Sequence, residues 1–336
     1  MRKVFGFAAV IILVILVVIY HEHTVNFSGF NSEKQDGRPA ADTTKSLVLK
    51  DLVYGKNIDW LGKMTDLTLD IYLPDAPVKN KKLPLVICVH SGGFVSGDKK
   101  AFETECRMLN AKGFIAASVN YRLGRDDNKN PCLSYLPETL SSVYRAVQDL
   151  RAATRYLAAN ATAYGIDTGW IFYEGASAGA ATCLETAYLT QDSADYYFHG
   201  SKNNLGLLKN GSNALPENYK IRGIASMWGA LYSEYIITEE NAIPSIFFHG
   251  ELDEIIPWDI GHFYSCDNMP ADFGSKALYE RLTSMGVPSV AHIDTKGRHG
   301  VYDKQFCQDN IACFFESLMK GQPQKGWYTT PVSNCR

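Results

Sequence analysis

The serine at position 177 lies in a sequence context that favours a nucleophile. Residues 175–179 read G-x-S-x-G; they follow the β-favouring run 170–173 and precede a series of small residues typical of a helix. A sharp turn from a strand into a helix exposes a serine hydroxyl, and glycines two residues before and after it allow such a crowded turn. The helix N-terminus would also bring a partial positive charge close to the hydroxyl. The pattern therefore predicts that Ser177 is a nucleophile.

A second glycine-containing segment could supply hydrogen-bond donors to a carbonyl oxygen. Residues 90–94 read His-Ser-Gly-Gly-Phe and follow an apolar run. Attack on a carbonyl needs N–H groups directed at the developing negative charge, and glycine lets the backbone approach the substrate closely. We therefore expect the N–H groups of Gly92, Gly93 and Ala178 to form an oxyanion hole. The alternative is a plain glycine-rich turn, and His90 is expected to support this loop without transferring protons.

A serine nucleophile needs a base, and the base needs an orienting acid. His299 follows the last strand-like run and is the predicted base, whereas His292 lies inside that run and is expected to be packed there. Asp253 is the predicted acid, because it occupies the fifth position of H-G-x-x-D-x-x-I-P at residues 249–257. Three neighbouring carboxylates are alternatives that we expect to be solvated loop charges: Glu251, Glu254 and Asp259.

Strand-like and helix-like segments alternate along most of the chain. Residues 46–54 and 66–73 alternate in polarity and are expected to pair near a sheet edge. The clearest helix is expected over residues 137–160, and a closing helix over 303–319. The remaining expected strands are short apolar runs at 85–89, 114–119, 170–174, 221–227, 245–249 and 289–293. This alternation predicts an α/β fold with a mostly parallel central sheet and helices on both faces.

One long segment interrupts the alternation. Residues 191–218 contain Tyr196, Tyr197 and Phe198, followed by a stretch rich in Gly, Asn, Lys and Ser. Such an excursion is either a surface insertion beside the active-site edge or a lid or wall of an acyl pocket. The sequence leaves both alternatives open.

The N-terminus has the pattern of a membrane-inserting segment. Arg2 and Lys3 precede an unbroken apolar run over residues 4–20, which reaches the short end of what can span a bilayer. No small-x-small cleavage site follows, so residues 1–24 are either a signal peptide or an N-terminal membrane anchor. Residues 25–45 are polar and are expected to be a tether to a domain over 46–336. Both alternatives predict export, with membrane contact through the N-terminal segment only.

The eight cysteines suit an exported protein. Cys88 lies in an apolar strand and Cys183 in the helix after Ser177, so both are expected to be buried free thiols. The other six are at positions 106, 132, 266, 307, 313 and 335. They predict three disulfides, with the pairing left open. No C-x-x-C or clustered Cys/His spacing indicates a metal site.

The charge of the chain gives no sign of a nucleic-acid partner. The formal net charge is -3 and no basic stripe is present, so a nucleic-acid partner is not expected. Nothing in the sequence indicates a cofactor or an oligomeric state.

Residues 46–319 resemble the secreted carboxylesterase/lipase group of the α/β-hydrolase superfamily, close to the H-G-G-G-type bacterial esterases. The stretches that carry the resemblance are 52–55, 69–72, 93–98, 119–124 and 175–179. The order Ser177, Asp253, His299 is the nucleophile–acid–base order of that fold. Ser91 and Ala180 depart from the usual pattern, which has glycine at both positions; the departures concern pocket detail.

The resemblance implies hydrolysis of carboxylic esters through an acyl-enzyme intermediate. It implies the roles of nucleophile for Ser177, base for His299 and acid for Asp253, with a small-molecule or polymer-borne ester as substrate and no cofactor. Two other functions stay open: a peptidase on the same fold, and a catalytically silent hydrolase-fold protein used for binding.

Overall fold

The computed structural model describes residues 47–335, except for 75–81, 125–131, 133–135 and 200. The predicted signal peptide or anchor and the tether therefore lie outside the described residues. Within the described part of the chain, every helix is too short or too polar to cross a bilayer.

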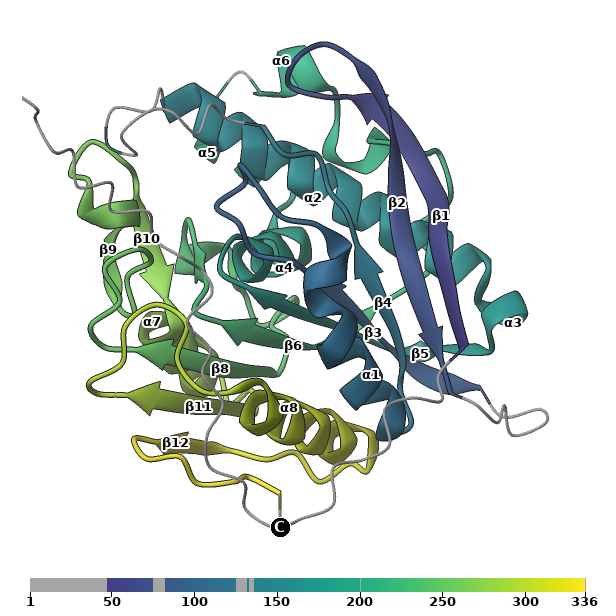
Figure 1. The fold of residues 1–336 in the computed structure, drawn as a ribbon. Coiled ribbons are helices and arrows are strands. Elements are labelled where there is room, and N and C mark those ends of the chain that lie inside the picture. The colour runs from purple at the N-terminus through teal and green to yellow at the C-terminus, as the bar shows by residue number, and fades with distance from the viewer. Residues whose placement is uncertain (1–46, 75–81, 125–131, 133–135, 200, 336) are drawn as a thin grey trace, which may run out of the picture. The chain divides into compact units, whose positions relative to one another are not determined.

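A large, mostly parallel sheet forms the centre of the domain (Figure 1). In the described residues it has nine strands in the order β1-β2-β4-β3-β5-β6-β8-β11-β12. They are β1 Leu47–Ile58, β2 Met64–Leu73, β3 Leu83–Val89, β4 Ile115–Val119, β5 Ile166–Ala176, β6 Ile221–Met227, β8 Ser245–Gly250, β11 Ser289–Asp294 and β12 Gly326–Tyr328. A smaller sheet joins β7 Ala230–Leu231, β10 Ala271–Gly274 and β9 Ile260–His262.

The predicted strand arrangement is confirmed. β1 pairs antiparallel with β2 at one edge, and β2 pairs antiparallel with β4. The strands from β4 through β12 then run parallel to one another. Because parallel strands end at the same edge, the loops after β3, β5, β6, β8 and β11 meet at one side of the sheet.

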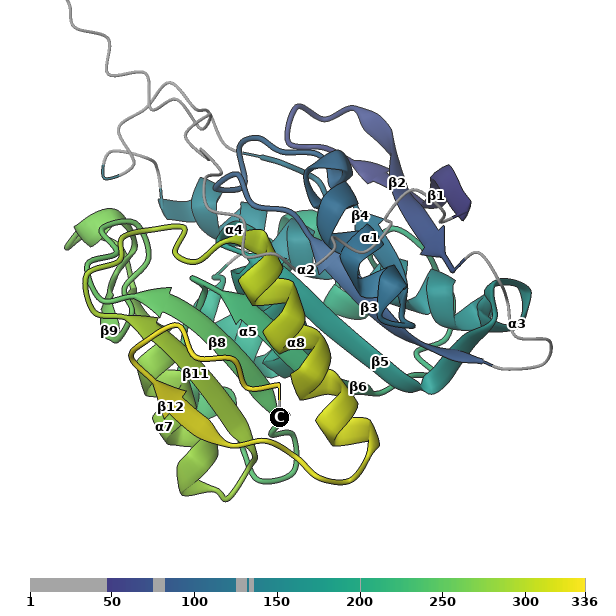
Figure 2. The ribbon, with the colours of Figure 1, turned by 60° about the horizontal axis from the view of Figure 1, so that its bottom comes forward.

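Helices cover both faces of this sheet, as the alternation of segments predicts. Helices α1 Glu103–Ala111 and α8 Lys304–Met319 lie on one face (Figure 2), and α2 Leu136–Ala159, α4 Ala178–Tyr188 and α7 Ser275–Ser284 on the other. Successive side chains of β3 alternate between the two faces: Ile87 belongs to the core under α2 and α4, and Val86 and Cys88 to the core under α1 and α8. This two-sided burial explains why the central strands are continuous apolar runs.

The segment 191–218 packs against α2 and the β1 edge. It contains α5 Gln191–Tyr197 and α6 Ser201–Leu205. The short helix α3 Ala161–Tyr164 is not part of this segment; it connects α2 to β5. The Asn213 side-chain amide donates to the carbonyl oxygens of Tyr54 and Ala152, both at 2.9 Å. These contacts tie the segment to the helix and the edge strand.

Two disulfides, and not the three predicted, join the cysteines. They are Cys132–Cys266 and Cys313–Cys335. Cys106 on α1 and Cys307 on α8 are free and buried, like Cys88 and Cys183. The prediction was wrong because Cys106 and Cys307 occupy the inward faces of two helices that pack over the sheet, where they fill core space as small apolar side chains.

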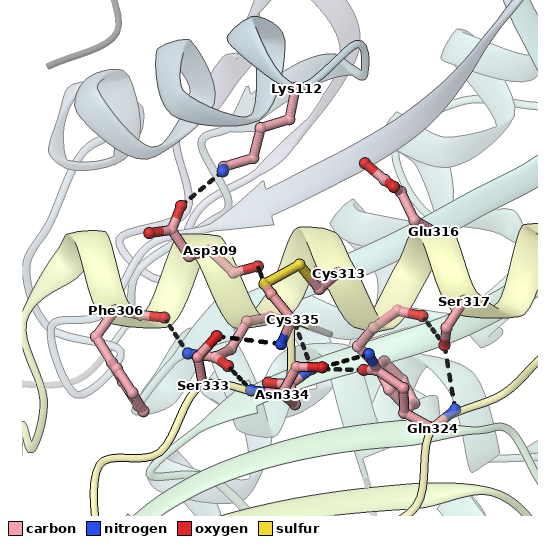
Figure 3. The surroundings of a disulfide bond; sticks show 12 residues. Lys112, Phe306, Asp309, Cys313, Glu316, Ser317, Gln324, Ser333, Asn334 and Cys335 are labelled. Atoms are coloured by element: carbon pink, nitrogen blue, oxygen red, sulfur yellow. Dashed lines mark hydrogen bonds and ion pairs between the residues drawn. A yellow bond between two sulfur atoms is a disulfide. The ribbon is translucent and has the colours of Figure 1, made fainter. Parts of the chain in front are cut away.

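The second disulfide fastens the C-terminal end of the chain to α8 (Figure 3). Cys335 is bonded to Cys313 in the middle of the helix. The neighbouring Asn334 is buried. Its backbone N–H donates to the side-chain oxygen of Asn310 at 2.6 Å, and its side-chain NH₂ group donates to the backbone carbonyl oxygen of Asn310 at 3.1 Å. The covalent bond and these hydrogen bonds together hold the terminal segment against the helix.

Candidate active site

Ser177 occupies a strained turn between β5 and α4. Its φ and ψ are 54° and -122°, a conformation that an L side chain rarely adopts. A Cβ on Gly175 would lie 2.4 Å from the carbonyl carbon of Gly179, and a Cβ on Gly179 would lie 2.0 Å from the carbonyl oxygen of Val89. Both glycines are therefore required for the turn, as the motif predicts. The Ser177 N–H donates to the Met227 carbonyl oxygen at 2.9 Å, which anchors the turn to β6.

The structure brings the predicted nucleophile, base and acid into one hydrogen-bonded chain. The Ser177 Oγ lies 2.9 Å from His299 Nε2, and His299 Nδ1 lies 2.7 Å from Asp253 Oδ2. His299 follows β11 and Asp253 follows β8, and these two strands are neighbours in the sheet. The Asp253 side chain is fully buried, whereas that of His299 is 14% exposed and so remains accessible from solvent.

Asp253 is held as a carboxylate by four donors. Its Oδ1 accepts from the N–H groups of Ile255 and Ile256, at 2.9 and 3.0 Å. Its Oδ2 contacts both His299 and a second histidine, His249, whose Nε2 lies 3.1 Å away. Burial by itself raises the pKa of the Asp253 carboxyl, but the hydrogen bonds from His249 and His299 outweigh it and hold the pKa well below its ordinary value. The acid therefore stays ionised across the physiological range.

Sequence reasoning missed two side chains beside this chain of contacts. His249 is fully buried on β8, and its Nδ1 lies 2.8 Å from the Ser275 Oγ. A signal for it was present, because it is the histidine of the same H-G-x-x-D motif that contains Asp253. Trp228 follows β6 and packs edge-on against the His299 ring, with centroids 6.2 Å apart. No motif marks it; only the position of β6 between β5 and β8 brings it there.

The predicted oxyanion donors lie on loops at the ends of two adjacent strands. Gly92 and Gly93 follow β3 with φ of 118° and 60°, and Ala178 is the first residue of α4. A Cβ on Gly92 would lie 2.0 Å from the Ser96 carbonyl oxygen, so this loop requires glycine. Within the described residues, the N–H groups of all three have no hydrogen-bond acceptor. They are therefore free to donate to a ligand.

His90 packs against Tyr121 and so supports the loop that contains Gly92 and Gly93. Its ring stacks on Tyr121 with centroids 4.4 Å apart, and the Tyr121 hydroxyl donates to the His90 carbonyl oxygen at 2.9 Å. Burial lowers the pKa of His90, which favours the neutral form of the ring. This arrangement agrees with the supporting role expected from the sequence.

The remaining candidates lie away from the Ser177 hydroxyl. Glu254 is paired with Arg298 on the surface, and Asp259 with Lys276. His292 is buried inside β11, between the rings of Phe248 and Tyr328, as predicted. Among the described residues, no group of three or more His, Cys, Asp or Glu side chains is placed to hold a metal ion.

A narrow pocket opens beside the nucleophile. Ala178, itself a predicted donor, and Phe94, which follows Gly93, line it together with other apolar side chains, among them Val143, Ile256 and Phe263. Among the described residues of 191–218, none lines this pocket. Phe198 packs edge-on against the lining residue Tyr232, with ring centroids 5.1 Å apart. The alternative of a lid formed by this segment stays a prediction.

A buried carboxyl lies beneath the nucleophile turn. Glu174 on β5 is fully buried and accepts a hydrogen bond from the Gln308 side-chain amide; its other oxygen lies 3.9 Å from the Cys88 thiol. Burial raises the pKa of Glu174 to about 8, and the Gln308 hydrogen bond opposes this only in part. The group is therefore protonated in the folded protein at neutral pH and ionised in the unfolded chain.

Glu174→Gln is expected to stabilise the protein at alkaline pH. In the wild type, the stabilisation from a neutral Glu174 is complete below the unfolded pKa of about 4.5 and is lost as pH rises through about 8. The amide never ionises, and its oxygen can still accept the hydrogen bond from the Gln308 side-chain amide. We expect Tm to rise by about 2–6 °C at pH 8.5 and to change little at pH 4.5. A Tm difference that is the same at both pH values, or a lower Tm at pH 8.5, would contradict this. The control is Glu316→Gln, which changes a carboxyl that is partly exposed to solvent.

Comparison with known proteins finds a family match and sequence similarity to esterases over part of the chain. Residues 69–231 match the protein family described as BD-FAE. The chain is 32% identical over 124 residues to Esterase LipI of Mycobacterium tuberculosis, covering 36% of this chain and 34% of that one. It is 29% identical over 160 residues to Acetylcholinesterase 1 of Caenorhabditis briggsae, covering 47% and 24%. The alignments thus span about a third or less of these curated relatives.

Solved structures share the fold at low sequence identity. Esterase 2 of Thermogutta terrifontis, phosphorylated by paraoxon, superposes with a TM-score of 0.57 at 17% identity, covering 85% of this chain and 98% of that one. Esterase B of Lactobacillus rhamnosis gives a TM-score of 0.54 at 17% identity, covering 83% and 88%. The strand order and the superpositions show that the chain has the α/β-hydrolase fold, and over part of its length its sequence is similar to those of esterases.

Proposed function

We propose that this protein hydrolyses carboxylic esters through an acyl-enzyme intermediate on Ser177. The observation that carries the proposal is the continuous chain of contacts from the Ser177 hydroxyl through His299 to the buried Asp253. Such a chain activates a hydroxyl that is otherwise a weak nucleophile.

Each group has a defined task in the proposed reaction. His299 Nε2 accepts the Ser177 proton as the oxygen attacks the ester carbonyl, and Asp253 stabilises the resulting imidazolium. The N–H groups of Gly92, Gly93 and Ala178 donate to the oxyanion; loss of one such donor costs about 3 kcal/mol in related hydrolases. His299 then returns the proton to the departing alcohol, and a water molecule hydrolyses the acyl-enzyme by the same steps.

The cellular location follows in part from the disulfides. Two disulfides favour an oxidising compartment, such as the outside of the cell. Whether residues 1–24 act as a cleaved signal peptide or as an anchor remains a prediction. In both cases the ester would be met outside the cytoplasm, as a small molecule or on a polymer.

The two rival functions make different demands on the site. A catalytically silent binding protein has no need for a strained serine hydrogen-bonded to an oriented histidine, so the site favours an enzyme. A peptidase would need to expel an amine, which is a poorer leaving group than the alcohol of an ester. Ester hydrolysis therefore demands less of the site and is the simpler proposal.

A panel of p-nitrophenyl esters from acetate to palmitate tests the proposal. We expect hydrolysis of at least the short-chain members, together with stoichiometric labelling of Ser177 by a fluorophosphonate, located by peptide mass spectrometry. The organophosphate reaction of the Thermogutta esterase supports the choice of probe. A folded protein that neither cleaves any ester nor takes up the label would favour the silent binder, and cleavage of peptide p-nitroanilides in preference to esters would favour the peptidase.

A further inference from the structure

Two acidic side chains line the apolar pocket beside Ser177. Glu185 projects from α4 and Asp272 from β10, and both are lining residues of the pocket formed by Ala178, Phe94 and Ile256. Their exposed fractions are 1% and 8%. Acidic residues are almost never buried to this extent without a partner, so the pair needs an explanation.

The hydrogen bonds of this pair are incomplete. One oxygen of Glu185 accepts from the Tyr232 N–H at 2.9 Å, whereas Oε2 is buried and has no partner among the described residues. Asp272 accepts from the Phe263 N–H. The hydroxyl oxygen of Thr139, on the α2 wall of the same pocket, is also buried and without a partner in the described part of the chain. The polar end of the pocket therefore has capacity for a ligand.

Positive charge is missing from this pocket. Among the described residues that line it, none is Lys, Arg or His. Burial raises the pKa of Glu185 and of Asp272 to about 8, and the proximity of Asp272 raises that of Glu185 further. A ligand hydroxyl could form hydrogen bonds with the polar groups of this pocket, but a single carboxyl would be enough to bind it. A cation placed against both carboxyls would lower the pKa of each and favour their charged forms, which a neutral ligand cannot do.

We propose that this pocket binds the acyl group of the substrate and that the preferred acyl group carries a protonated amine at its far end, received by Glu185 and Asp272. This proposal rests on the ester hydrolase function proposed above. The pocket is assigned to the acyl group, and not to the alcohol, because the departing alcohol must lie next to His299 to take its proton. His299 and Trp228 do not line the pocket, so the alcohol lies outside it.

The substrates that test this proposal differ only at the far end of the acyl chain. They are p-nitrophenyl 3-aminopropanoate and 6-aminohexanoate, their alkyl counterparts butanoate and heptanoate, and the hydroxy ester 6-hydroxyhexanoate. The aliphatic amines stay protonated at pH 7.5. Two lengths are used because the carboxyls accept an ammonium only when the chain reaches them. We expect kcat/KM for one amino ester to exceed that of its alkyl counterpart by about 10- to 100-fold.

The variants Glu185→Gln and Asp272→Asn remove charge without changing shape. In the glutamine variant the Tyr232 N–H still needs an acceptor, so the amide oxygen is expected to face it and the NH₂ group to replace the free Oε2. A donor would then face the incoming ammonium. We expect the amino-to-alkyl ratio of kcat/KM to fall at least 10-fold in each variant. Glu174→Gln, a buried carboxyl change outside the pocket, should keep the wild-type ratio, and Tm of every variant checks folding.

Each result decides the proposal. An amino ester preferred by the wild type, with a ratio that falls in both pocket variants, supports it. Equal or faster hydrolysis of the alkyl or hydroxy esters by the wild type overturns it, as does a ratio that the pocket variants leave unchanged. Failure of this kind leaves alkyl ester hydrolysis intact, whereas absence of hydrolysis of all five esters would overturn the proposed function and this inference together.

Discussion

Replacing Ser177 with alanine is expected to lower kcat for p-nitrophenyl butanoate by about 10⁶-fold, as in other serine hydrolases whose nucleophile is removed. The Ser177 Oγ is the atom that His299 Nε2 contacts at 2.9 Å, so the variant loses the attacking atom and the acyl-enzyme route. The fold should persist, because the turn depends on Gly175 and Gly179 and on the Ser177 N–H, none of which changes.

The measurement is steady-state hydrolysis of wild type and variant purified side by side, with fluorophosphonate labelling and Tm. Ser226→Ala is the matched control. Ser226 is a fully buried serine on the neighbouring strand β6, and its hydroxyl has no partner among the described residues. We expect the control to keep wild-type kcat and labelling. Substantial ester hydrolysis by Ser177→Ala would show that another residue forms the acyl-enzyme.

Asp253→Asn is expected to lower kcat by about 10⁴-fold with little change in KM. The N–H groups of Ile255 and Ile256 would hold the amide oxygen where Oδ1 now lies. The amide NH₂ would then face His299 Nδ1, which must accept a hydrogen bond in place of donating one. The ring proton moves to Nε2, and His299 can no longer take the proton of Ser177.

Glu254→Gln provides the control for this second prediction. Glu254 is the adjacent residue, but it is exposed and paired with Arg298 on the surface. Its loss should leave kcat unchanged, because an exposed ion pair contributes little and does not touch His299. The check is kcat of both variants from pH 6 to 9. Equal effects of the two substitutions would mean that Asp253 does not orient the base.

Local sequence determined the nucleophile turn and the order of the chemical groups. The glycines at 175 and 179 leave few conformations other than a strand-to-helix turn, because a side chain at either position would overlap neighbouring backbone. The short apolar runs determined the central strands for a similar reason: a strand buried on both faces tolerates few polar side chains. Ser177, Asp253 and His299 could therefore be named, each at the end of one such run.

The environment of those groups was decided only by the tertiary structure. His249 contacts Asp253, and Trp228 contacts His299, because β6, β8 and β11 are neighbours in the sheet, and strand order is not encoded within any one segment. The cysteines show the same limit, since burial of Cys106 and Cys307 depends on how α1 and α8 pack on the sheet.

The substrate pocket depends most on tertiary structure. Glu185 lies in a helix and Asp272 in a short strand of the smaller sheet, and nothing in their local sequences marks either as buried. Their meeting beside Ala178 follows from the packing of α2, α4 and β10 around one cavity. The sequence alone thus determined the proposed reaction, because its groups are bound to local turns, whereas the choice of substrate depends on contacts between segments far apart in the chain.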